Sequence, residues 1–144
     1  MKHALPILGA LAVCLAGCAS VTEKVTGWLS SNVDAIGVLD GRVMQGQANF
    51  ASEREATMQL QSMEAPSLTC FGALRYTATH SGVVDFSCND GRTIRLAFQS
   101  LGRLSGSGRG WLGQSEFALT YGLPPAQAAS FLALPIERLV QTKK

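Results

Sequence analysis

An alternation of apolar and polar residues with a period of two is the feature that most limits the fold of this chain. It runs through residues 37–122, where glycines and turn-forming residues separate short alternating segments. Successive side chains of a β-strand point to opposite faces of a sheet, so the pattern predicts strands with one buried face. The apolar members of the predicted strands are Ala56, Met58 and Leu60; Leu68, Cys70, Leu74 and Tyr76; Val84, Phe86 and Cys88; Ile94, Leu96 and Phe98; and Phe117, Leu119 and Tyr121.

The start of the chain has the pattern of an export signal. Met1-Lys2-His3 is basic, the run from Ala4 to Val13 is apolar, and small residues follow it. This order is typical of a secretory signal peptide. The apolar run is shorter than the roughly 20 residues that a membrane-spanning helix needs. We therefore expect residues 1–17 to be removed.

The stretch Leu15-Ala16-Gly17-Cys18 resembles the lipobox of bacterial lipoproteins. The resemblance implies that Cys18 becomes the first mature residue and carries acyl chains, palmitate among them. Two such chains hold a protein stably in a membrane. In enteric-type lipoproteins an Asp after the cysteine favours the inner membrane, and Ala19 stands here instead. The implied location is the outer membrane, facing the periplasm. The alternative to lipidation is that Cys18 is a spare or buried thiol in an ordinary signal peptide.

Three segments follow from these patterns: a lipoprotein signal peptide over 1–17, a lipidated N-terminus with a tether or short helix over 18–36, and a β-domain with a C-terminal helix over 37–144. Within 18–36, apolar residues recur at the helical spacings of three and four, although Gly27 interrupts them. This stripe either lies on the bilayer surface or packs on the β-domain. Its members are Val21, Val25, Trp28, Leu29, Val33 and Ile36.

The charge balance argues against a nucleic-acid partner. Once residues 1–17 are removed, 11 Lys and Arg residues remain against 10 Asp and Glu residues in a chain of 127. A nearly neutral chain creates no strong field that would attract a polyanion. A chain of this length is enough for one domain with one core.

Cys70 and Cys88 are the cysteines that remain after the signal peptide and Cys18 are accounted for. An even pair in an oxidising compartment predicts a disulfide, and two buried free thiols are the alternative. If the two lie directly opposite each other in an antiparallel hairpin, Leu74 falls opposite Val84 and Gly72 opposite Phe86. A one-residue slip would place core residues opposite polar ones. The disulfide and the alternation therefore predict the same hairpin, with its turn near 78–80.

The following turn contains Asn89-Asp90-Gly91. A two-residue Asp-Gly turn would mismatch the faces of the two strands. A three-residue loop with Gly91 in the left-handed conformation places Phe86 opposite Ile94, and it is the turn that we predict.

The apolar face of such a sheet must be covered, either by closure of the sheet on itself or by a helix. Pro124-Pro125 and the alanine-rich residues after them predict a helix that Pro135 ends. We expect Leu123, Phe131 and Leu134 to plug one end of the barrel. The predicted fold is a small antiparallel β-barrel or curved sheet of about six strands with a C-terminal helix.

None of the candidate chemical motifs has the context that its chemistry requires. The glycine-rich segment 106–110 lacks a following helix and Lys-Ser/Thr pair, so we expect a flexible or bulged β-connection and not a phosphate loop. His80 falls at a predicted turn, Asp85 and Glu116 have no reason to be close, and the serines lack a nucleophile elbow. We therefore expect no enzyme activity, metal or cofactor.

Two further resemblances are present, the first of them over residues 68–122. The segment 84–92, followed by an alternating strand and a Gly-x-Gly-x-Gly stretch, resembles small bacterial lipoproteins of uncharacterised function. The lipid anchor and disulfide also resemble membrane-bound lysozyme inhibitors, but Ser105-Gly106-Ser107-Gly108 and Ser107-Gly108-Arg109-Gly110 both lack the tyrosine of their Ser-Gly-x-x-Tyr loop. We expect a lipid-anchored envelope protein with a structural, assembly or interaction role and an envelope protein as a possible partner. The alternative is a ligand-binding β-barrel or an inhibitor of a cell-wall hydrolase.

Overall fold

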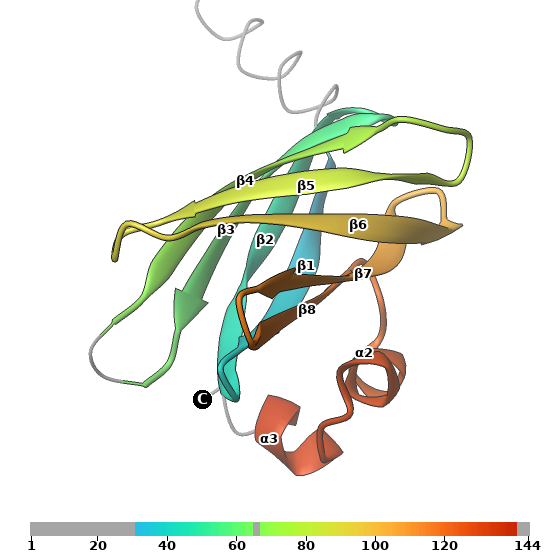
Figure 1. Cartoon of the computed structure of the whole chain (residues 1–144). Coiled ribbons are helices and arrows are strands. Elements are labelled where there is room, and N and C mark those ends of the chain that lie inside the picture. Colours follow the sequence, from blue (N-terminus) through green and yellow to red (C-terminus); the bar gives the residue numbers. More distant parts are fainter. Residues whose placement is uncertain (1–30, 65–66, 141–144) are drawn as a thin grey trace, which may run out of the picture.

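The computed structural model describes residues 31–64 and 67–140 and shows a closed antiparallel β-barrel with two short helices (Figure 1). Each strand pairs with the next along the chain, and β8 pairs with β1 to close the barrel. Eight strands in place of about six correct the predicted count. The elements are β1 (Ser31–Leu39), β2 (Arg42–Ser52), β3 (Glu55–Ser62), β4 (Thr69–Tyr76), β5 (Ser81–Cys88), β6 (Thr93–Gly102), β7 (Ser105–Leu112), β8 (Ser115–Tyr121), α2 (Pro125–Leu132) and α3 (Ile136–Val140).

The predicted hairpin is confirmed. Cys70 and Cys88 are joined by a disulfide with their Cα atoms 4.0 Å apart, and Leu74 lies opposite Val84. The strands end at Tyr76 and resume at Ser81, so the turn falls where the register placed it. The alternation along these strands therefore determines which side chains enter the core.

The next hairpin is confirmed as well. Phe86 lies opposite Ile94, as the three-residue loop requires. The Cys88 amide donates to the Arg92 carbonyl at 2.9 Å, and Gly91 has φ +89°. Glycine adopts this left-handed conformation without a steric penalty, which explains its place in the turn.

Strand β1 begins at Ser31, so the predicted boundary of the β-domain at residue 37 is wrong. Residues 31–36 belong to the barrel and not to a tether. Val33 packs against the interior and Ile36 against the helices, as period two requires. The signal peptide, Cys18 and the rest of the predicted helical stripe lie outside the described residues.

The segment 106–110 is not a flexible connection but the middle of strand β7. Its three glycines alternate with outward residues and point into the barrel. A Cβ added at Gly106 would come 2.5 Å from the Tyr121 hydroxyl, and one at Gly110 would come 2.6 Å from Leu96 Cβ. The glycines therefore make room for large side chains. Their partners on β8 are Tyr121 for Gly106, Leu119 for Gly108 and Phe117 for Gly110.

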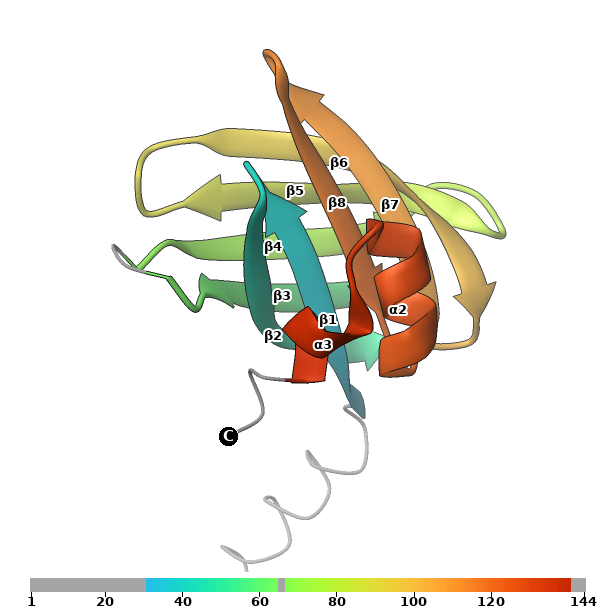
Figure 2. The ribbon, with the colours of Figure 1, turned by 90° about the horizontal axis from the view of Figure 1, so that it is seen from below.

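The helices lie on the outer wall of the barrel (Figure 2). Ala128, Ala129 and Leu139 form a second apolar cluster with Val43, an outward residue of β2. The expectation that Leu123, Phe131 and Leu134 plug a barrel end is wrong. Leu123 and Leu134 join this outer cluster, and Phe131 is 42% exposed.

Helix α2 also ends earlier than predicted. It stops at Leu132, and Ala133 follows with φ +53°, while Pro135 stands before α3. Ala133 donates its amide back to Ser130, so a left-handed cap and not the proline terminates the helix.

Candidate functional site

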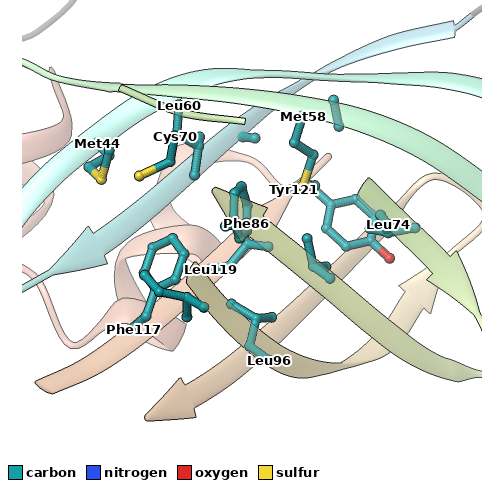
Figure 3. Packing of buried hydrophobic residues seen from close by; sticks show 14 of the residues in the cluster. Met44, Met58, Leu60, Cys70, Leu74, Phe86, Leu96, Phe117, Leu119 and Tyr121 are labelled. Atoms are coloured by element: carbon teal, nitrogen blue, oxygen red, sulfur yellow. The ribbon is translucent and has the colours of Figure 1, made fainter. Parts of the chain in front are cut away.

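The interior of the barrel is filled by side chains (Figure 3). Leu74, Phe86, Leu96 and Phe98 are each no more than 1% exposed. The rings pack edge to face, with centroids 5.1 Å apart for Phe86 and Phe117. An eight-stranded barrel has just enough interior for its own side chains or for one small ligand. Here the side chains occupy it, so a ligand would find space only at the barrel ends and on the outer wall.

One barrel end is held by charges that connect separate turns. Arg92, after the β5–β6 turn, contacts Asp40 in the β1–β2 turn at 2.7 Å and Asp90 also at 2.7 Å. Hydrogen bonds from Ser115 and from Arg92 hold the pKa of Asp40 below its usual 3.8. Arg92 therefore links the two turns, and this arrangement stabilises them.

The opposite barrel end has a polar hollow of about 530 Å³. The Arg54 guanidinium lies 5.4 Å from the Tyr76 ring centroid and donates to the Ala78 carbonyl at 3.2 Å. Arg103 pairs with Glu53 at 2.6 Å. Both arginines are thus engaged in contacts within the protein. We interpret the hollow as an end of the barrel that these contacts close.

Beneath this hollow the hydroxyls of Tyr76 and Tyr121 lie 3.3 Å apart. Burial raises the pKa of Tyr121 well above its ordinary value, and the hydrogen bond to Tyr76 adds to the effect. A hydroxyl with a raised pKa stays protonated at neutral pH, so this pair satisfies two polar groups in the core and supplies no base.

One hollow on the outer wall is a groove between the barrel and the helices, which we name the helix groove. Its volume is about 390 Å³, within the range of small-molecule sites. Strands β1 and β2 form its floor, and the turn into α2 together with α3 forms its apolar side. Its lining residues are Asp34, Ala35, Ile36, Gln45, Gly46, Gln47, Leu123, Pro125 and Leu139.

The residues considered from sequence for chemistry are not brought together. His80 is exposed in the β4–β5 turn. Asp85 pairs with Arg75 and Arg95, whereas Glu116 pairs with Arg109. Among residues 31–64 and 67–140, no three His, Cys, Asp or Glu side chains gather as a metal site would require. In the same residues, no helix has the length and hydrophobicity to cross a bilayer.

Sequence reasoning missed the helix groove, although a signal for it exists. Ile36 and Val38 point outward on β1, between the inward residues Ala35, Gly37 and Leu39. A strand that is apolar on both faces is covered on both faces. The pattern therefore marks β1 as one of the strands that the helices cover, together with β8 and β2.

Comparison with known proteins gives the fold and nothing beyond it. No protein-family model and no curated protein sequence matches the chain. A solved structure described as a redesigned beta barrel is similar, with a TM-score of 0.51 and 12% identity over 69% of this chain and 94% of that chain.

Proposed function

We propose that this protein is a lipid-anchored component of the bacterial cell envelope with a non-enzymatic structural, assembly or interaction role. The observation that carries the proposal is the filled barrel, because a protein without an interior site works through its outer wall. The disulfide between β4 and β5 and the ion pairs between turns favour a rigid wall. A rigid surface suits recognition, since little conformational entropy is lost on binding.

The sequence before the barrel supports the anchor. Leu15-Ala16-Gly17-Cys18 ends the apolar run, and β1 starts at Ser31. The twelve residues 19–30 span at most about 40 Å when extended. A barrel on this tether stays close to the membrane surface, which we take to be the periplasmic side of the outer membrane.

The anchor is tested by Cys18→Ser, with Cys14→Ser as the matched control. Both cysteines lie near the end of the predicted signal, but Cys18 alone is expected to receive acyl chains. We expect Cys18→Ser to leave the membrane fraction or to stay unprocessed, and Cys14→Ser to behave as wild type. Intact mass and membrane fractionation measure this. An unchanged mass and distribution for Cys18→Ser would exclude the anchor.

An environment-sensitive apolar dye distinguishes the proposed role from the alternative of a ligand-binding barrel. A filled interior predicts no increase in dye fluorescence on adding the folded protein, because Phe86 and Phe98 already occupy the space. A saturable increase would favour an internal ligand site and contradict the proposal, since the barrel's own side chains fill its interior.

The hydrolase-inhibitor alternative has less support. The resemblance rests on the predicted lipid anchor and the disulfide. The Ser-Gly-x-x-Tyr loop of those inhibitors has no match here, and Ser105 to Gly110 belong to strand β7, with the glycines turned inward. This segment is therefore part of the sheet and provides no loop that could insert into an enzyme cleft.

A further inference from the structure

The helix groove begins close to the point where the chain enters the barrel. Strand β1 starts at Ser31, and Asp34, three residues later, is the first residue of β1 in the groove floor. On this floor Asp34 lies opposite Gln47, and Ile36 lies opposite Gln45. Both helices lie beside β1 (Figure 2), and the apolar wall of the groove is formed by Leu123, Pro125 and Leu139. The groove therefore combines polar groups on its floor with an apolar wall.

Asp34 gives the groove its charge. It is exposed, and it is the charged residue among the described lining residues. Within residues 31–64 and 67–140 its carboxylate takes part in no salt bridge, whereas Arg138 of α3 is paired with Glu64 at 3.8 Å. An occupant that carries a cation next to large apolar side chains would therefore complement the groove.

The segment that leads into β1 has apolar side chains in a suitable arrangement. It comprises residues 19–30, which lie outside the described residues, and its sequence contains Val25, Trp28 and Leu29. Spacings of three and four place these three on one face of a helix. A buried tryptophan removes about 150–250 Å² from water, so this face gains free energy from an apolar surface that covers it.

The same segment carries one cation. Lys24 precedes Trp28 by four residues, so on a helix it lies next to the indole ring. Glu23, the one acidic residue of the segment, falls on the opposite side of such a helix with Gly27. The face that presents Trp28 therefore presents a positive charge as well, and it complements both Asp34 and the apolar wall.

The segment is long enough to reach the groove. Asp34 lies about 10 Å from Ser31 along β1, at about 3.3 Å per residue. Trp28 precedes Asp34 by six residues, which span about 20 Å when extended. The chain therefore reaches the groove if it reverses direction before Ser31. Covalent connection gives the segment an effective concentration of the order of millimolar, which favours it over a free ligand.

The C-terminal end of the chain is another segment that could enter the groove. It follows α3, whose Leu139 lines the groove, and it reads Gln141-Thr142-Lys143-Lys144. These residues supply cations for Asp34 but no large apolar side chain, so their binding would leave the apolar wall uncovered. The N-terminal segment matches both properties of the groove.

We propose that residues 24–29 bind in the helix groove, with the Trp28 ring against the apolar wall and the Lys24 ammonium beside the Asp34 carboxylate. The binding itself does not depend on lipidation. Its consequence rests on the anchor proposed above: residues 19–23 then remain as the tether, about 17 Å long in place of about 40 Å. The docked segment therefore holds the barrel closer to the membrane and restricts its orientation there.

Tryptophan fluorescence tests the docking, because the chain contains two tryptophans, Trp28 and Trp111. Trp111 is 65% exposed, so Trp111→Phe leaves Trp28 as the reporter without changing the core, and Trp28→Phe leaves an exposed reference. Both proteins are measured as purified from cells in mild detergent, with acrylamide as a neutral quencher. We expect a quenching constant for Trp28 at least about threefold lower than for Trp111, which corresponds to a docked population of about two thirds. Equal constants would overturn the proposal.

A second measurement separates the groove from the bilayer, where the same apolar side chains could also be buried. The Trp111→Phe protein is reconstituted into phosphatidylcholine vesicles with and without bromine on the acyl chains. Bromine quenches an indole ring that lies among those chains. We expect the same Trp28 emission in both kinds of vesicle. A loss of emission in the brominated vesicles would place the segment in the bilayer and contradict docking in the groove.

Substitutions in the Trp111→Phe protein locate the docked segment. Gln47→Arg places a cation directly opposite Asp34, where it competes with Lys24. Gln59→Arg is the matched control, because Gln59 is also exposed and lies opposite Gln47 on β3, outside the groove lining. Thermal unfolding verifies that each variant folds. We expect Gln47→Arg to raise the quenching constant of Trp28 to that of the exposed reference and Gln59→Arg to leave it unchanged. Equal constants for the two variants would exclude this groove.

A charge exchange tests the proposed ion pair. Lys24→Asp and Asp34→Lys each bring like charges together, so each is expected to raise the quenching of Trp28. The double variant restores opposite charges and should restore the low quenching constant, whereas a double variant as exposed as the single ones would contradict the contact. An exposed Trp28 in protein that Cys18→Ser releases from membranes leaves the anchor proposal intact. A protected Trp28 in protein that never associates with membranes contradicts the anchor alone.

Discussion

The Phe86 ring covers Gly72, its partner on the neighbouring strand β4. A Cβ added at Gly72 would come 2.5 Å from Phe86 Cε1 and 2.7 Å from Phe86 Cδ1. The glycine is therefore required by the ring, and the two residues form one packing unit beside the disulfide. Inward glycines also face large neighbours on β7. The small barrel can close because several strands lack side chains at positions where other strands carry rings.

We expect Gly72→Ala to destabilise the protein by about 1–3 kcal/mol, the usual effect of overpacking a core. The ring must move, because nothing else can yield at this contact. Chemical denaturation of the variant measures the change in the free energy of unfolding. Combining Gly72→Ala with Phe86→Leu should cost less than the two single changes added together. Additive effects would show that the contact is not the cause.

Loss of the Cys70–Cys88 bridge should cost about 3 kcal/mol, since the bridge closes a loop across a sequence separation of 18. We expect the Cys70→Ala, Cys88→Ala double variant to keep its β-sheet spectrum, because Leu74 and Val84 still define the register. Denaturation with and without reductant measures the cost, and reductant should leave the double variant unchanged. Two reactive thiols in unfolded, unreduced protein that lacks residues 1–18, whose cysteines are Cys70 and Cys88, would contradict the bridge.

The cross-turn contact of Asp40 predicts a loss of stability in acid. Hydrogen bonds from Ser115 and Arg92 lower the pKa of Asp40 in the folded protein below its usual 3.8. A lowered pKa in the folded state stabilises the protein above pH 3.8, and this stabilisation is lost as the pH falls through the folded-state pKa. Unfolding free energies measured at pH 6 and pH 3 should differ less in Asp40→Asn than in wild type. An equal difference would assign the acid sensitivity to other carboxylates.

The strands that sequence reasoning identified share one property: apolar side chains occupy most of their inward positions. Leu74, Val84 and Phe86 define the inward face and the register of the β4–β5 hairpin. The position of the two cysteines opposite each other agrees with that register. Strand β7 was missed because its inward positions are glycines, which carry no apolar signal. The identity of β7 is visible only from its partners, whose side chains fill the space that the glycines leave.

Strands β1 and β2 were missed for a different reason. Their turn does carry a sequence signal, because Asp40-Gly41 is a common two-residue hairpin turn, and both residues adopt positive φ here, +52° and +74°. The apolar residues before it occupy both faces of β1, so their spacing also fits a helix. The cross-strand pairing of Gln47 with Gln59 on the outer wall could not be predicted either, because it depends on the register of β2.

The helices are expected to contribute to the stability of the barrel through the outer cluster. Leu139 of α3 is 4% exposed and packs with Val43 of β2, whereas Ile136 of the same helix is 43% exposed. Leu139→Ala should cost about 2 kcal/mol, the lower range for a buried leucine, because the cluster is small. Ile136→Ala, the matched control, should change the free energy of unfolding by less than about 0.5 kcal/mol. Truncation after Leu123 removes the whole cover and should lower the melting temperature further than Leu139→Ala. If the truncated chain melted like the full-length protein, α2 and α3 would be an appendage, and the helix groove would lose one of its walls without cost to the barrel.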